Sequence, residues 1–303
     1  MTRPVAVVTI AHGRHEHLAR QLRSLAACTR RPDHVLDHVL VAMGDPELDS
    51  WHQREGVHVE SMKADPDALP LAAARNLGAN AAIDRGAETI VFLDVDCLPG
   101  PDLVDGYERA VARWPDTIWS GPVTYLPPGL TEDQLAQPQE IDDPHPARPA
   151  PAPGDVVHDA ERDLFWSLSF ALDRRAWLRS GGFCERYVGY GGEDTDFAHQ
   201  AAHCGLRFGW VGDARAYHQH HPTQHPPVQH LDDILRNGAI FHERWGRWPM
   251  IGWLDAFERL GLVERSGGAW RRTHAPHDEG PPISVSAGRR PFFEPPVGIE
   301  PTT

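Results

Sequence analysis

Apolar runs and amphipathic segments alternate along the N-terminal part of the chain. Short runs of consecutive apolar residues, such as Val5–Ile10 and Ile90–Leu93, are typical of strands buried on both faces. Between them apolar residues recur at helical spacing, as at Leu18, Leu22 and Leu25. This alternation implies a mostly parallel sheet flanked by helices. The predicted strands are 5–10, 35–43, 57–62 and 88–94, and the predicted helices are 15–27, 71–85 and 102–114.

The second half of the chain carries further core-like elements. Apolar stretches predict a strand at 165–172 and a short one at 208–211. We therefore expect one α/β domain over residues 1–260, in which 228–260 forms a helical extension. The helices expected here are 174–180, 193 to about 204, 228–245 and 253–260.

Two segments lack the periodicity of a core. Residues 127–154 are rich in proline and acidic side chains, and core-like sequence resumes after them. They are predicted to form a flexible loop that is mobile without ligand. From about His274 glycine, proline and charge dominate, which predicts a disordered tail over 274–303.

Charge and cysteine usage narrow the class of protein. The 303 residues include 43 acidic and 29 basic side chains, and the net charge of −14 argues against nucleic acid and anionic membranes as main partners. The four cysteines are widely spaced, as expected of reduced thiols in a cytosolic protein. The first apolar run is too short to span a bilayer and lacks a signal-peptide layout. We expect a cytoplasmic protein that is not an integral membrane protein.

Two carboxylates follow the apolar run Ile90–Leu93. Side chains at i and i+2 of an extended chain point the same way, so Asp94 and Asp96 leave one face of a strand at its C-terminal end. Ligands of open α/β sheets bind at that end. Neighbouring carboxylates repel each other unless a cation neutralises them. A solvated turn explains this pair equally well by itself, whereas the rest of the chain favours a divalent cation site.

A glycine-rich segment leads into a second acidic cluster. The glycines of 189–192 let the backbone approach a ligand closely. Glu193, Asp194 and Asp196 follow, and Glu193 or Asp194 is expected to cap a helix. An acidic first turn that complements the helix dipole is the alternative. Three carboxylates in so short a stretch exceed what capping needs.

Three histidines follow the strand predicted at 208–211, namely His218, His220 and His221. Neutral imidazole is a common ligand for transition metals, and Mn²⁺ accepts a mixed set of carboxylate and imidazole ligands. A histidine cluster alone is more often surface than site, and this chain has 19 histidines. A metal-binding role for these histidines is favoured only because they follow the two acidic segments in the chain.

The order of these segments resembles that of nucleotide-sugar glycosyltransferases of the GT-A fold. A strand with Asp-x-Asp is followed by Gly181-Gly-Phe183, then by Gly189-Tyr-Gly-Gly-Glu-Asp-Thr-Asp196, then by a distal histidine. The chain is similar to family-2-like bacterial enzymes related to the β-1,4-galactosyltransferases and to the catalytic region of polypeptide GalNAc-transferases. The resemblance covers roughly residues 4–260 and implies a Rossmann-like, mostly parallel sheet. The proline-rich insert and the several candidate histidines depart from the family pattern.

The resemblance implies how a donor would be bound. A divalent cation, Mn²⁺ or Mg²⁺, would be held by Asp96 and His218, with Asp94 near the ribose or reaching the metal through water. His218 is favoured over His220 and His221, but the choice among the three stays open. The other residues implied in donor binding are Arg14, Asp45, Arg75 and Asn76.

Individual roles follow from the same resemblance. Asp45 is similar to the acid that reads the nucleotide base, and Arg75 or Arg14 would complement phosphate charge. Asp194 aligns with the base that deprotonates the acceptor hydroxyl in an inverting transfer. Glu193 would hydrogen-bond acceptor hydroxyls. The remaining acceptor-binding residues are Trp166 and Tyr190, which would stack on sugar faces, and Gly192.

The sequence therefore predicts a metal-dependent, inverting glycosyltransferase. It would move a hexose or N-acetylhexosamine from a nucleotide sugar, with UDP favoured by analogy, to a hydroxyl of a carbohydrate or other acceptor. One alternative is a sugar-1-phosphate nucleotidyltransferase, but Val5–Leu18 lacks the glycine-rich signature of such enzymes. The other is a non-catalytic nucleotide- or carbohydrate-binding module. The intact acidic residues and His218 argue against it, and an activity assay separates the two.

Overall fold

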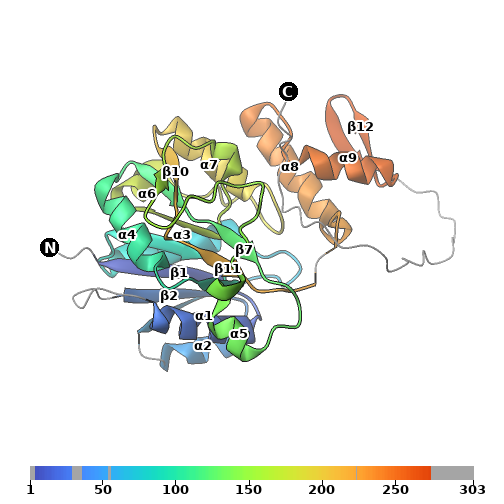
Figure 1. Cartoon of the computed structure of the whole chain (residues 1–303). Coiled ribbons are helices and arrows are strands. Elements are labelled where there is room, and N and C mark those ends of the chain that lie inside the picture. Colours follow the sequence, from blue (N-terminus) through green and yellow to red (C-terminus); the bar gives the residue numbers. More distant parts are fainter. Residues whose placement is uncertain (1–3, 29–35, 54–55, 223, 274–303) are drawn as a thin grey trace. The chain divides into compact units, whose positions relative to one another are not determined.

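The computed structural model describes residues 4–28, 36–53, 56–222 and 224–273 (Figure 1). The chain divides into two compact units, Met1–Gly189 with Glu193–Pro222 and Tyr190–Gly192 with Thr223–Thr303. The C-terminal segment has a hydrophobic core of its own, from Leu231 to Trp270. One domain over residues 1–260 with a helical extension stays a prediction. The predicted tail at 274–303 lies outside the described residues.

The first unit is built on an eight-stranded sheet in the order β3-β2-β1-β4-β9-β6-β10-β8. β3, β2, β1 and β4 run parallel to one another, β10 runs parallel to β6, and β9 and β8 are antiparallel to their neighbours. The predicted mostly parallel sheet is thus confirmed. Its strands are β1 Val5–Ala11, β2 Leu36–Met43, β3 Val57–Met62, β4 Thr89–Leu93, β6 Thr117–Ser120, β8 Val156–Val157, β9 Ser169–Asp173 and β10 Arg207–Val211.

Helices cover this sheet and bring polar side chains to the C-terminal ends of its strands. Every residue of β1 and β4 is buried, which explains why all of their residues except Thr9 and Thr89 are apolar. α3 packs so closely on β1 that a Cβ at Gly78 would lie 2.4 Å from Cγ1 of Val8. The helices of this unit are α1 His15–Ala27, α2 Pro46–Asp49, α3 Leu71–Asp84, α4 Leu103–Arg113, α6 Arg174–Ser180 and α7 Glu193–His203, with 3₁₀ turns η1 Ser50–Gln53 and η3 Arg162–Leu164.

A second, three-stranded sheet was not predicted from the sequence. It consists of β5 (Cys97–Pro99), β11 (Ala216–His218) and β7 (Val123–Tyr125), in the order β5-β11-β7. His218 is paired with Cys97 on one side and with Tyr125 on the other. Strands of three residues carry too little periodicity to be recognised in sequence. The strand predicted at 165–172 is likewise shifted, since pairing with β4 begins only at Ser169.

The proline-rich segment 127–154 contains more structure than its composition predicts. It holds α5 (Glu132–Ala136), which begins with a capping box between Thr131 and Gln134, and the 3₁₀ turn η2 (Pro138–Ile141). α5 lies beside α1 (Figure 1), where Glu132 forms ion pairs with Arg20 and Arg23. Apolar side chains of the segment also pack against the small sheet. Mobility of this segment without ligand stays a prediction.

The second unit consists of helices and a hairpin. The predicted helices are present, and the hairpin was not predicted. The hydrophobic core of this unit contains buried residues of its two α-helices and of the hairpin, including Ile234, Phe257 and Trp270. The elements are η4 Val228–His230, α8 Leu231–Trp245, α9 Ile251–Arg259, β12 Val263–Ser266 and β13 Ala269–Arg272. No helix among the described residues is long and apolar enough to cross a membrane.

Candidate active site

The turn that follows β4 is held in place by a buried glutamine of α1. The Gln21 side chain donates hydrogen bonds to the backbone oxygens of Asp94 (2.7 Å) and Cys97 (2.9 Å). Its own oxygen accepts one from the Thr9 hydroxyl at 2.9 Å. The sequence analysis missed this residue. The signal was a polar side chain on the apolar face that Leu18 and Leu25 define.

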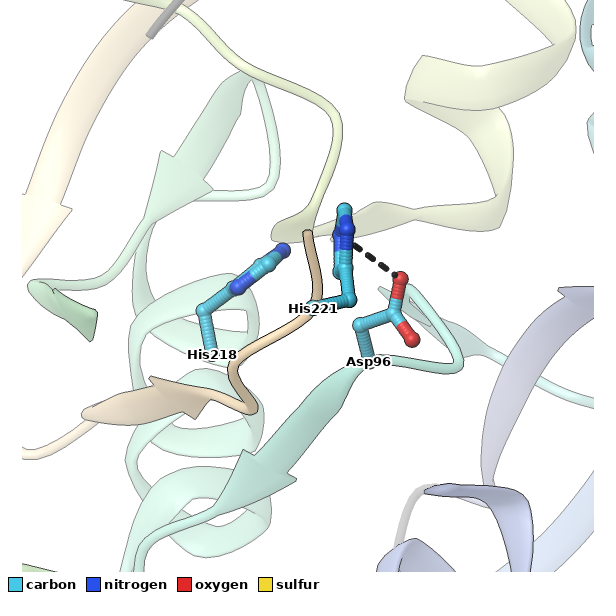
Figure 2. A group of neighbouring side chains, drawn as sticks. All are labelled: Asp96, His218 and His221. Atoms are coloured by element: carbon cyan, nitrogen blue, oxygen red, sulfur yellow. Dashed lines mark ion pairs between the residues drawn. The ribbon is translucent and has the colours of Figure 1, made fainter. Parts of the chain in front are cut away.

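Asp96, His218 and His221 form one group at the end of this turn, called the Asp96 group below (Figure 2). One ligand atom of each lies within 4.8 Å of the others, and Nε2 of His221 is 3.5 Å from Oδ2 of Asp96. The second oxygen, Oδ1, is buried without a hydrogen-bond partner among the described residues. His220 is exposed. The structure therefore favours two histidines where the resemblance favoured His218 alone.

The small sheet brings the Asp96 group together. Because β11 pairs with β5, His218 lies opposite Cys97, the residue after Asp96. Between the two histidines, the backbone N–H of Gln219 donates to the backbone oxygen of Asp96 at 2.7 Å. Gln219 is buried, and its side chain also bonds the backbone of His17 in α1 at 3.3 Å. The histidine segment is thus held by one hydrogen bond to the turn and by another to α1.

The charges around the Asp96 group suit a divalent cation. Burial lowers the pKa of His218 to about 4 and also lowers the pKa of His221, although Asp96 opposes both shifts. Both imidazoles are therefore neutral at pH 7, which is the form that binds metals. Two imidazoles and a carboxylate form a ligand set that suits transition metals such as Mn²⁺. Arg14 contributes a nearby positive charge, since its Nε lies 3.8 Å from Oδ1 of Asp96.

Arg75 occupies the centre of a second group on the other side of the turn, called the Arg75 group below. It is only 4% exposed, and its guanidinium lies 3.2 Å from Asp94, 3.5 Å from Glu193 and 3.9 Å from Asp194. Its contacts in the structure are thus with three carboxylates, and the expected contact with phosphate stays a prediction. The group joins the turn after β4 to the first turn of α7.

Burial and neighbouring carboxylates raise the pKa values of two acids in the Arg75 group. Burial, and then the neighbouring Asp194, raise the pKa of Glu193 to about 7, in spite of Arg75. Burial likewise raises the pKa of Asp94 to about 6, against the opposing attraction of Arg75. One cation does not neutralise three carboxylates, so the group favours retention of a proton near neutral pH.

Asp194 is oriented by Ser167, which the sequence analysis did not single out. The Ser167 hydroxyl donates to one carboxylate oxygen at 2.6 Å, and its backbone N–H donates to the other at 3.1 Å. The carboxylate that was expected to cap α7 is thus held by the segment before β9. The β4–β9 pairing continues as far as the bond from the Asp94 N–H to the oxygen of Leu168. A quarter of the Asp194 side chain, 24%, remains exposed.

Two residues expected to bind donor instead hold neighbouring loops. The Asn76 side chain donates hydrogen bonds to the backbone oxygen of Phe183 and to Glu185, and it accepts one from the backbone N–H of Phe183. It therefore fixes the Gly-Gly-Phe segment. Phe183 is itself core, stacked on Phe197. Asp45 accepts hydrogen bonds from Gly13, His15 and Glu47. Although burial opposes them, these bonds lower the pKa of Asp45.

The residues expected to bind acceptor fall in different units. Trp166 belongs to the first unit and is 6% exposed, with Arg148 over its ring. Tyr190 and Gly192 belong to the second unit. There Tyr190 stacks between His230 and Trp253, and its backbone N–H donates to Asp233.

Comparisons with known proteins point to one class of enzyme. Residues 160–223, which include Asp194 and both histidines of the Asp96 group, match a family described as the N-terminal domain of galactosyltransferase. The chain is 26% identical to an N-acetylglucosaminyl-diphospho-decaprenol L-rhamnosyltransferase of Mycobacterium tuberculosis, over 82% of this chain and 89% of the relative.

Solved structures agree on the fold. GalNAc-T7, crystallised with UDP, GalNAc and Mn²⁺, has a TM-score of 0.52 at 16% identity and covers 72% of this chain. S. aureus TarS in complex with UDP-GlcNAc has a TM-score of 0.55 at 10% identity and covers 78% of this chain. The chain spans 44% of the GalNAc-T7 chain and 66% of the TarS chain. Together with the matched segment and the rhamnosyltransferase relative, this fold supports a GT-A glycosyltransferase related to the galactosyltransferases.

Proposed function

We propose that the chain is a metal-dependent, inverting glycosyltransferase that moves a hexosyl or N-acetylhexosaminyl group from a UDP sugar to an acceptor hydroxyl. One observation carries the proposal. The turn at 94–96 belongs to both groups, because Asp96 faces His218 and His221 while Asp94 contacts Arg75 beside Glu193 and Asp194. The turn thus connects the candidate ligands for a phosphate-bound cation, through Asp96, with the group that contains the candidate base Asp194, through Asp94 and Arg75.

The residues that would hold the cation are Asp96, His218 and His221. The buried, unpartnered oxygen of Asp96 and the two neutral imidazoles fit a divalent ion. Imidazole ligands favour Mn²⁺ over Mg²⁺, which prefers oxygen. When bound, such an ion supplies Lewis-acid stabilisation of the diphosphate leaving group.

Asp194 is the proposed base. Its carboxylate accepts the proton of the acceptor hydroxyl while that oxygen attacks the anomeric carbon on the face opposite the departing diphosphate. Ser167 fixes both carboxylate oxygens, which lowers the cost of orienting the base. Glu193, with a pKa of about 7, exists in both protonation states near neutral pH and can donate or accept a hydrogen bond from an acceptor hydroxyl.

The relatives differ in the sugar that their names or bound ligands indicate. The TarS and GalNAc-T7 structures contain UDP-GlcNAc or UDP with GalNAc, and they support a UDP-linked N-acetylhexosamine. The mycobacterial relative is named as a rhamnosyltransferase that acts on a diphospho-decaprenol, and it aligns over most of both chains. Rhamnosyl transfer to a lipid-linked sugar is therefore the second candidate. Location in the cytoplasm stays a prediction.

A thermal-shift screen of nucleotides and nucleotide sugars, with and without Mn²⁺, tests the proposal. A ligand at a hundred times its dissociation constant should add about 2.7 kcal/mol of stability. Asp96→Ala should abolish the metal-dependent part, whereas the exposed Asp84→Ala serves as the matched control. If no nucleotide or nucleotide sugar stabilises the protein more with Mn²⁺ than without it, the proposed site is wrong.

The product distinguishes the enzyme classes. A glycosyltransferase incubated with donor and acceptor releases the nucleoside diphosphate, whereas a nucleotidyltransferase releases pyrophosphate from a nucleoside triphosphate. A non-catalytic module binds donor and releases neither. Chromatographic measurement of the released nucleotide therefore separates the three.

A further inference from the structure

Arg148 is a buried cation without a partner, in the segment between β7 and β8. The residue is only 7% exposed. All three nitrogens of its guanidinium are buried and lack a hydrogen-bond partner among the described residues. Its backbone N–H bonds the oxygen of His145 at 3.1 Å, so the main chain at this position is held. A guanidinium carries five N–H donors, and leaving them unpaired inside a protein is costly.

The surroundings of Arg148 are mostly aromatic. Its guanidinium lies over the ring of Trp166 and 5.9 Å from the centre of the Trp210 ring. A cation over an aromatic ring gains roughly 0.5–2 kcal/mol, which does not replace the lost hydrogen bonds. Burial accordingly lowers the pKa of Arg148 well below its ordinary value, and Tyr125 and Asp194 only partly oppose this.

Two acids of the same segment are already engaged by other arginines. Asp142 pairs with Arg215, and Glu132 pairs with Arg20 and Arg23. Asp194 attracts Arg148 but forms no ion pair with it. The folded chain thus encloses a cation and does not give it a carboxylate.

Arg148 lies between the two groups of the candidate active site. On one side, Trp166 directly precedes Ser167, which orients Asp194. On the other side, His145 contacts the Trp166 ring at 5.6 Å and the Tyr125 ring at 5.8 Å. Tyr125 in turn lies 4.7 Å from the ring of His218. An anion held by Arg148 would therefore be bound beside both the base and the metal ligands.

We propose that Arg148 is an anion-binding residue whose guanidinium pairs with a phosphate group of a substrate. The inference rests on the proposed glycosyl transfer and specifies a further contact in that site. The planar guanidinium matches two phosphate oxygens at once, which suits it to this role better than lysine. The phosphate belongs either to the nucleotide donor or to a phosphorylated acceptor, and the two sources give different binding results.

The experiment compares Arg148→Gln, Arg148→Lys and the wild type by calorimetric titration of the metal-free protein. The probes are inorganic phosphate, UDP and uridine. Arg113→Gln is the matched control, because Arg113 also stacks on a tryptophan, at 4.6 Å from the Trp114 ring, but is exposed. Loss of a charge-assisted contact should weaken binding of the relevant phosphate at least ~10-fold in Arg148→Gln and less in Arg148→Lys. Uridine should bind equally well to all variants.

The outcomes are separable. Weaker UDP binding with unchanged uridine binding assigns the phosphate to the donor, and weaker binding of inorganic phosphate alone assigns it to the acceptor. Arg148→Gln should unfold at no lower denaturant concentration than the wild type, because it removes an unpaired buried charge. A variant that loses stability but keeps its affinity for UDP and for phosphate would show that Arg148 is structural and overturn the proposal. Absence of sugar transfer in the wild type would instead refute the proposed function and leave these titrations valid.

Discussion

The Asp96 group and the Arg75 group share one turn but differ in what lies next to their carboxylates. In the Arg75 group a buried cation is surrounded by Asp94, Glu193 and Asp194. In the Asp96 group a carboxylate faces two imidazoles that burial keeps neutral. The protein supplies a buried arginine to the first group, whereas the arginine beside the second, Arg14 at 3.8 Å from Asp96, is partly exposed. The two aspartates of the motif thus have different surroundings. Asp94 is paired with Arg75, whereas Asp96 lies beside candidate metal ligands.

The largest effect is expected from removing the cation of the Arg75 group. Arg75→Met leaves three carboxylates without their common partner, and should lower the free energy of unfolding by about 3 kcal/mol, the lower end for a broken buried ion pair. Urea unfolding measures this. Arg85→Met is the control, since Arg85 forms an exposed ion pair with Asp37 and should cost less than about 1 kcal/mol. Equal losses in the two variants would mean that the Arg75 group contributes no more than a surface pair.

The next effect concerns chemistry in the same group. Asp194→Asn should keep both contacts with Ser167, since the amide oxygen accepts from the backbone N–H and the amide NH₂ donates to the hydroxyl oxygen, and should leave the donor dissociation constant within a few-fold. Transfer should fall at least ~10²-fold, the lower end for loss of a general base. Product formation under saturating donor measures this, with Asp84→Asn as the control. A variant that transfers sugar at nearly the wild-type rate would leave Asp194 with a structural role only.

In the Asp96 group, both histidines should contribute to metal binding. Removal of either imidazole takes away one ligand, so His218→Ala and His221→Ala should each weaken Mn²⁺ binding at least ~10-fold, a loss of about 1.4 kcal/mol. Calorimetric titration with Mn²⁺ in the presence of UDP measures this. His220→Ala should bind Mn²⁺ like the wild type, because His220 is exposed and outside the group. Normal affinity in His221→Ala would restore the single-histidine site that the resemblance implied.

The last effect is a pH dependence of stability in the Arg75 group. Folding raises the pKa of Glu193 from 4.5 to about 7, so the folded protein retains a proton that the unfolded chain has released. Through this residue, stability falls as the pH rises from about 4.5 to 7. Glu193→Gln removes that loss, and its stability relative to the wild type should therefore rise between pH 5 and pH 8. The exposed Glu161→Gln should show no such trend in the same urea titrations.

Local sequence patterns predicted much of the first unit. The strands before Asp94 and the helices α1, α3 and α4 agree with the structure to within a residue or two, because each has a clear period and a defined end. Gln21 and Ser167 were missed. Each is a single polar residue, and its role depends on a partner that is remote in sequence. The proline-rich segment was expected to lack structure, yet it buries Arg148 beside Trp166.

The sequence by itself determined that two aspartates follow a buried strand, because the apolar run ends just before them. The expected shared face was wrong, since the chain turns after Leu93 and the two side chains join different groups. The sequence also placed an acidic helix start and a histidine segment further along. Only the tertiary structure decided which of these residues meet. β11 and β5 are too short to be recognised, yet their pairing brings His218 and His221 to Asp96, and the burial of α3 carries Arg75 to Asp94, Glu193 and Asp194. Contacts of this kind depend on the packing of remote segments, and no local period records them.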